Sequence, residues 1–169
     1  MAASAPRTVR GYLARAASSP VARSIAEPDG VELAYDKQDG AGPTIVFLPG
    51  FRSDMTGDKA TSLAAFARQR GQAFLRFDYS GHGASGGDFL QGTIGVWASD
   101  ALTLIDRVTQ GDLILVGSSM GGWIGLLTAL ARPDRVKAFV GIAAAPDFTE
   151  RRWAAMPEAD RETMRRDGM

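Results

Sequence analysis

The stretch Leu113–Pro133, with the sequence LILVGSSMGGWIGLLTALARP, decides the fold. Leu113–Val116 is too short and too uniformly apolar to be anything other than a buried strand. The run from Gly121 to Arg132 predicts a helix that Pro133 ends. Between them lies Gly117-Ser118-Ser119-Met120-Gly121, a GxSxG sequence in the context that this motif requires, after a strand and at the start of a helix.

The GxSxG turn predicts a nucleophilic serine at Ser119. The flanking glycines let strand and helix pack closely while the serine is held in a strained conformation, with its hydroxyl above the sheet. The Met120 N–H is left unpaired at the helix N-terminus, where it can stabilise an oxyanion. The alternative is an ordinary Gly/Ser-rich turn or a phosphate-binding loop, but the latter requires GxxxxGK[ST] and no lysine follows here.

The rest of the chain alternates between strand and helix patterns. Strands are predicted over residues 31–35, 44–48, 73–77 and 136–142, and helices over residues 58–70 and 94–108. This alternation predicts the α/β class, with a mostly parallel sheet covered by helices on both faces. The active site is expected at the carboxyl ends of the strands, where the loops converge.

A second oxyanion donor has to come from another loop. Pro49-Gly50-Phe51 directly follows the strand predicted to end at Leu48, so the Phe51 N–H is the candidate. Alternatively, Pro-Gly simply turns the chain and Phe51 packs in the core.

His82 is the single histidine of the sequence and must be considered as the general base for Ser119. It lies in a glycine-rich loop after a predicted strand, where a histidine is more often a surface or turn residue, so we expect it not to reach Ser119. Asp78 and Asp147 also follow predicted strands. Asp78 is expected to tie down its own loop, and Asp147 to cap the helix after it.

Composition narrows the function further. The 169 residues carry 19 basic and 19 acidic side chains, so no net charge draws the protein to nucleic acid or anionic lipid. The absence of cysteine excludes disulfides, thiolate nucleophiles and cysteine metal sites. No apolar run is long enough to cross a bilayer. A soluble domain that acts on a small molecule is expected, with no metal or organic cofactor.

The chain is expected to divide into three parts. Residues 1–26 are rich in Arg, Ala and Ser and are expected to be a disordered or targeting segment. Residues 27–149 form the core, and residues 150–169 form the start of a cap or a helical tail. A cytoplasmic location is expected, with a mitochondrial one as the alternative if Met1–Ala26 is a transit peptide.

Several motifs together resemble a known family. They are Phe47-Leu48-Pro49-Gly50-Phe51, Arg76-Phe77-Asp78-Tyr79-Ser80-Gly81, Gly117-Ser118-Ser119-Met120-Gly121-Gly122-Trp123 and Ala131-Arg132-Pro133. From about Gly30 to Asp147 the chain resembles the α/β-hydrolase superfamily, and within it the abhydrolase domain-containing protein 10 family of palmitoyl-protein thioesterases and acyl-glucuronide esterases. The resemblance implies Ser119 as nucleophile and the N–H groups of Phe51 and Met120 as oxyanion hole. The family's acid and histidine lie on later strands, beyond the last residue of this sequence.

The expected function is therefore a serine hydrolase that acts on acyl esters or thioesters through an acyl-enzyme, with a small molecule or an acylated protein as substrate. The chain has no triad Asp and His and is expected to be nearly inactive as it stands. One alternative is a non-catalytic fragment that binds acyl groups or a partner; another is a different α/β-hydrolase reaction. The strand 136–142 is expected to form an exposed edge that promotes aggregation.

Overall fold

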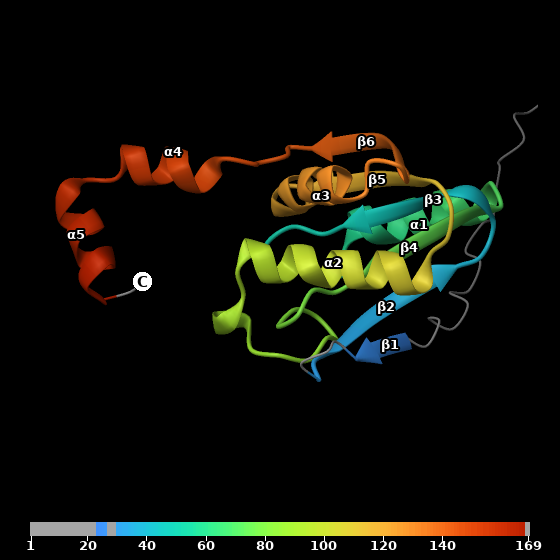
Figure 1. Ribbon diagram of the computed structural model, residues 1–169, viewed down its shortest axis with the longest axis horizontal. Helices are drawn as coiled ribbons and strands as arrows, with labels where there is room; N and C mark the ends of the chain where they lie inside the picture. The colour runs from blue at the N-terminus through green and yellow to red at the C-terminus, as the bar shows by residue number, and fades with distance from the viewer. Residues whose placement is uncertain (1–22, 27–29, 168–169) are drawn as a thin grey trace, which may run out of the picture.

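The computed structural model describes residues 23–26 and 30–167. The described residues form one sheet of six strands in the order β1-β2-β4-β3-β5-β6. The strands are β1 (Arg23–Ala26), β2 (Glu32–Gln38), β3 (Ala41–Leu48), β4 (Gln72–Phe77), β5 (Leu113–Ser118) and β6 (Val136–Ile142). Strands β3 to β6 pair in parallel, whereas β1 and β2 join the other edge antiparallel (Figure 1). The predicted α/β class with a mostly parallel sheet is confirmed.

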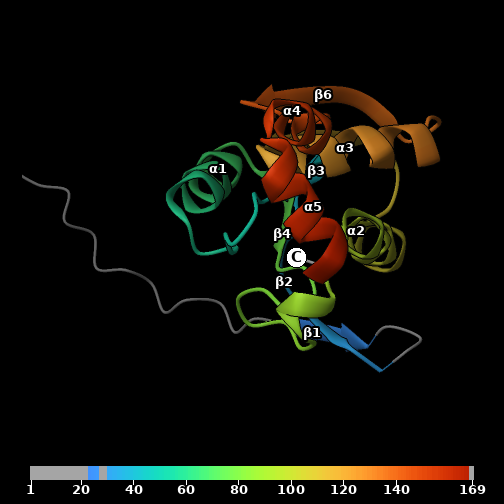
Figure 2. The same cartoon turned by 90° about the vertical axis from the view of Figure 1, so that its left-hand side faces the viewer.

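Helices cover both faces of the sheet (Figure 2). Helix α1 (Asp58–Gln69) buries three alanines against one face, with Ile45, Phe47 and Phe74. Helices α2 (Ile94–Val108) and α3 (Met120–Ala131) cover the other face, where Trp97, Leu104 and Ile124 pack on the larger core. The two apolar faces arise because the parallel strands β3 and β5 are apolar on both sides, as buried strands are.

The N-terminal end of the described chain differs from the prediction. The segment expected to be disordered over residues 1–26 falls mostly outside the described residues, but Arg23–Ala26 forms β1, and Ile25 packs against the core. The tail forms two helices, α4 (Phe148–Ala155) and α5 (Glu158–Asp167), and neither buries a residue. They extend away from the sheet (Figure 1). A contact between the rings of Trp123 and Phe148 joins α4 to α3.

The loops at the carboxyl ends of β3, β4 and β5 carry the candidate site residues. Phe51 follows β3, and Asp78 and His82 follow β4. Ser119 lies between β5 and α3. A short 3-10 helix, η1 (Phe89–Gln91), which the sequence did not predict, closes the loop after β4 before α2 begins.

Candidate functional site

Ser119 lies between a strand and a helix, as the sequence predicts, and it is the single residue that separates β5 from α3. Its backbone has φ 53° and ψ −118°, a conformation that non-glycine residues rarely adopt and that costs on the order of 1–3 kcal/mol. Two hydrogen bonds to the β6 side hold the turn: Ser119 N–H donates to the Ile142 carbonyl at 2.9 Å, and its carbonyl accepts from Ala145 N–H at 3.3 Å. The residue is nevertheless exposed. An exposed hydroxyl on a strained turn is typical of a nucleophilic serine.

Two glycines make this turn possible. A Cβ at Gly117 would collide with the Gly121 and Gly122 backbone, and a Cβ at Gly121 would collide with the Leu48 carbonyl. Strand β5, helix α3 and the end of β3 therefore approach at distances that only glycine allows.

The two candidate oxyanion donors are both available. Met120 is the first residue of α3, where an N–H has no partner within the helix. Within the part of the chain that the structure describes, neither the Met120 N–H nor the Phe51 N–H donates a hydrogen bond. The Phe51 loop reaches Ser119, because a Cβ built on Gly50 would lie 3.4 Å from the Ser119 Cβ. Phe51 is 51% exposed, so it is not a core residue.

His82 was expected to be a surface or turn residue; it lies in a turn, where its N–H donates to the Tyr79 carbonyl at 3.0 Å, and it is buried, with 5% of its surface exposed. Its Nδ1 lies 3.1 Å from the Ser80 carbonyl oxygen, and its Nε2 lies 3.3 Å from the Arg52 backbone nitrogen. Because a carbonyl only accepts, Nδ1 carries the proton and Nε2 accepts from the Arg52 N–H. No hydrogen bond joins His82 to Ser119 among the described residues.

Asp78 ties down its own loop, as predicted, and also the loop after β3. Its carboxylate accepts from Met55 N–H at 2.6 Å and from Ala84 N–H at 2.8 Å. Burial raises the pKa of Asp78 above its ordinary value, against these two hydrogen bonds, which lower it. The carboxylate thus joins the loop after β3 to the loop after β4.

Asp147 occupies the N-cap position of α4, but the prediction that it caps the helix is wrong. Its side chain makes no capping hydrogen bond and pairs instead with Arg151 at 2.8 Å. A partner one helical turn away competes for the same carboxylate.

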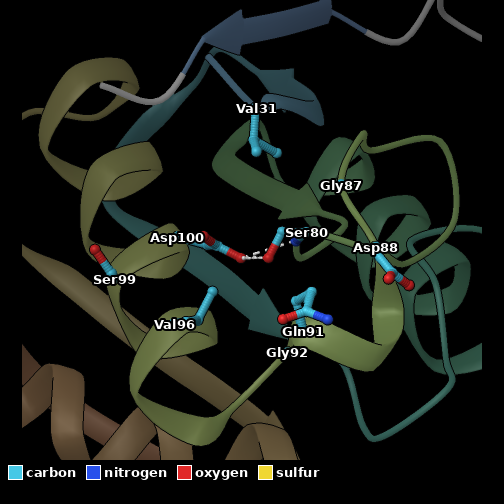
Figure 3. A pocket seen from close by; sticks show the side chains of 9 residues that line it. All are labelled: Val31, Ser80, Gly87, Asp88, Gln91, Gly92, Val96, Ser99 and Asp100. Carbon is cyan, nitrogen blue, oxygen red and sulfur yellow. Dashed lines mark hydrogen bonds between the residues drawn. The ribbon is translucent and has the colours of Figure 1, made fainter. Parts of the chain in front are cut away.

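A pocket of about 280 Å³ lies between α2 and the loop after β4 (Figure 3). In it the Asp100 carboxylate accepts from the Ser80 N–H at 2.8 Å and from the Ser80 hydroxyl at 2.7 Å. Sequence reasoning missed Asp100. The available signal was a carboxylate three residues after Trp97 and four before Leu104, within the apolar stripe of a helix.

The described residues contain no group of three His, Cys, Asp or Glu side chains that could hold a metal ion. No helix in that same part of the chain is both long and apolar enough to span a membrane.

The family described as the alpha/beta hydrolase fold matches residues 43–168. The chain belongs to the alpha/beta hydrolase fold family. The solved structure of alpha/beta hydrolase domain-containing protein 10 from mouse superposes with a TM-score of 0.82 and 39% identity, over 88% of this chain and 60% of that one. The structure of a putative hydrolase from Agrobacterium vitis S4 superposes with a TM-score of 0.76 and is 39% identical in sequence. The match covers 85% of this chain and 59% of that one.

Among curated alpha/beta hydrolases, the human mitochondrial palmitoyl-protein thioesterase ABHD10 is 45% identical over 130 residues, 77% of this chain and 42% of the relative. The chain thus spans less than half the length of that relative. The resemblance predicted from the sequence motifs is confirmed.

The expected cytoplasmic location is wrong. The human relative and its rat and mouse counterparts are all named as mitochondrial proteins, a finding that stands against the cytoplasm. Sequence composition had left mitochondria as the alternative through Met1–Ala26, most of which lies outside the described residues.

Proposed function

We propose that this alpha/beta hydrolase acts on acyl esters or thioesters with Ser119 as its nucleophile. The observation that carries the proposal is the backbone of Ser119, an exposed residue at φ 53° between a strand and the first residue of a helix. Strain of this kind persists only where the surrounding structure imposes it, and it clusters at active sites. The names of the thioesterase relatives support the substrate class.

In the proposed reaction, Ser119 Oγ bonds to the acyl carbonyl carbon as its proton passes to a solvent water, and the carbonyl oxygen takes up the negative charge. The N–H groups of Phe51 and Met120 hold this oxyanion. Its collapse breaks the bond to the alkoxide or thiolate and leaves an acyl-enzyme. Water then attacks the acyl carbon, releases the acid and restores Ser119.

The proton of Ser119 needs a base, and His82, the one histidine in the sequence, has both ring nitrogens engaged. In a serine protease, removal of the triad lowers kcat by about six orders of magnitude. The reaction that remains is still roughly 10³–10⁴ times faster than in water. The 169-residue chain is therefore expected to hydrolyse its substrates slowly. The same observation favours the second candidate function, a non-catalytic protein that binds acyl groups.

Hydrolysis of p-nitrophenyl acyl esters and of acyl thioesters tests the proposal, together with mass spectrometry of the chain after treatment with an alkyl fluorophosphonate. The parent chain should show a low rate and an adduct on Ser119, and Ser119→Ala should lose both. Ser118→Ala changes the adjacent, buried serine and is the matched control. An adduct on another residue, or a rate that survives Ser119→Ala, would contradict the nucleophile; no adduct and no rate would favour the binding protein.

The acyl group and the compartment are also proposals. The names of the relatives support a palmitoyl chain on a protein as the substrate, and a location in mitochondria. Fusion of Met1–Ala26 to a fluorescent protein tests the location, which would be contradicted by a signal that stays in the cytoplasm.

A further inference from the structure

The turn that carries the Phe51 amide has an unusual conformation. Ser53 N–H donates to the Gly50 carbonyl at 3.1 Å and closes the turn, and Arg52 takes up φ 55° inside it. The left-handed region disfavours residues with a side chain, so the surroundings must hold Arg52 there. The backbone of Arg52 is held there by a hydrogen bond from its N–H to Nε2 of His82 at 3.3 Å, and its guanidinium lies over the Phe89 ring, 5.1 Å from the ring centroid.

The imidazole of His82 is itself held from several sides. Its ring meets those of Phe89 and Trp97 edge-on, with 5.1 Å between centroids in both pairs. Its Nδ1 faces the carbonyl oxygen of Ser80, which also accepts from Trp97 Nε1 at 3.1 Å.

Ser80 is anchored in turn by helix α2. Its N–H and its hydroxyl both donate to the carboxylate of Asp100, which is 3% exposed (Figure 3). A rigid chain of contacts therefore runs from α2 through Ser80 to His82 and on to Arg52. These contacts orient the imidazole so that the lone pair of His82 Nε2 faces the Arg52 N–H, in the loop that also carries Phe51.

Two simpler accounts of His82 fail. A general base needs a free nitrogen near Ser119, and both nitrogens of His82 already have partners. A residue that only fills the aromatic cluster needs no nitrogen at all, and phenylalanine would fit there at no desolvation cost.

We infer that His82 is a positioning residue for the oxyanion hole: in its Nδ1–H form it holds the Arg52 amide and so aims the adjacent Phe51 N–H at the oxygen beside Ser119. The inference rests on the proposed function. It requires the neutral imidazole, because a protonated ring has no lone pair to offer Arg52 N–H.

Three variants separate this role from packing. His82→Phe keeps an aromatic ring and removes the acceptor. His82→Gln places a carbonyl oxygen near the position of Nε2 and should rescue the acceptor. Trp97→Phe is the matched control, since it disturbs the same cluster and removes a hydrogen bond to Ser80 but leaves the bond between His82 and Arg52.

The first readout is the affinity for an alkylboronic acid, which needs no turnover. The Ser119 oxygen bonds to boron and its proton leaves to solvent, so that a boronate oxygen stands where the oxyanion would form. A misplaced donor should weaken this adduct, and His82→Phe should bind about 10-fold more weakly than the parent, whereas His82→Gln and Trp97→Phe should stay within about threefold. Equal affinity of His82→Phe and the parent would overturn the inference alone. Equal affinity of Ser119→Ala and the parent would overturn the proposed function.

The second readout is nuclear magnetic resonance of the parent chain. It can be measured even if His82→Phe fails to fold. A scalar coupling across the N–H···N bond should link the Arg52 amide nitrogen to His82 Nε2, and Nδ1 should carry the proton. In folded His82→Phe, the Arg52 amide should exchange with solvent at least about 10-fold faster than in the parent. A proton on Nε2, or no coupling to Arg52, would overturn the inference.

Discussion

Ser119 donates its backbone N–H to the carbonyl of Ile142 at 2.9 Å, a hydrogen bond that ties the turn after β5 to the end of β6. The Ala145 N–H donates to the Ser119 carbonyl from the same side. These two bonds hold the serine at φ 53° against its intrinsic preference. The strain at the proposed nucleophile is thus maintained by a strand that lies at the edge of the described sheet.

Relief of this strain should stabilise the fold. Ser119→Gly should raise the free energy of unfolding by about 1 kcal/mol, because glycine adopts positive φ without steric cost. Urea denaturation measures the change. The control is Ser62→Gly, an exposed position inside α1, where glycine should lower the stability by about 0.5 kcal/mol. A loss of stability in both variants would show that Ser119 is not strained.

Gly121 should tolerate no side chain. A methyl group there would collide with the Leu48 carbonyl, so Gly121→Ala should separate α3 from β3 and lower the free energy of unfolding by about 2 kcal/mol. Gly95→Ala is the control in α2, where the added Cβ meets only Thr93 Oγ1 at 3.7 Å. It should raise stability by about 0.5 kcal/mol, because alanine favours helix more than glycine does. Thermal melts of both variants decide the point.

The pH dependence of stability should reveal the buried carboxylate of Asp78. Burial raises its pKa above the ordinary 3.8, so the folded state binds this proton more tightly than the unfolded chain does. The stability of the parent relative to Asp78→Asn should therefore fall as the pH rises above 3.8 through the folded-state pKa. Urea denaturation of the parent and of Asp78→Asn, at several pH values between about pH 3 and pH 7, measures this difference in the free energy of unfolding.

Asp54 provides the control of opposite sign. Hydrogen bonds from the Thr56 side chain and backbone lower its pKa below 3.8, so the stability of the parent relative to Asp54→Asn should be lost as the pH falls below 3.8. Curves that slope in the same direction for both variants would contradict the assignment of these two carboxylates.

The edge of the sheet at β6 should drive self-association. Strand β6 pairs with β5 and has no other strand beside it among the described residues, and Val140 is 49% exposed there. Val140→Lys should reduce ANS binding and the aggregated fraction in size-exclusion chromatography, because a charged edge resists strand pairing. Val96→Lys, at a valine 42% exposed on α2, should not. A parent chain that is monomeric and binds no ANS would refute the prediction.

Most of the fold could be predicted because its signals are local. The helices α1 and α2 and the strands β4 and β6 lie within a residue or two of the predicted ranges, since apolar periodicity and glycine or proline boundaries act over a few residues. Strand β1 could not, because Arg23–Ala26 is a strand only through its pairing with β2. The tail was predicted as helical, but Pro157 divides it into α4 and α5.

For the site, the sequence by itself determined the turn at Ser119, since GxSxG between an apolar strand and a helix specifies a backbone that few other structures use. Only the tertiary structure decided what surrounds that turn. His82 was expected to be a surface or turn residue, and its burial in the turn follows from contacts with Arg52, 30 residues away, and with Ser80, which Asp100 holds from 20 residues away. Such partners meet because parallel strands bring their carboxyl ends to one edge, and no local pattern in the chain records which loops will touch there.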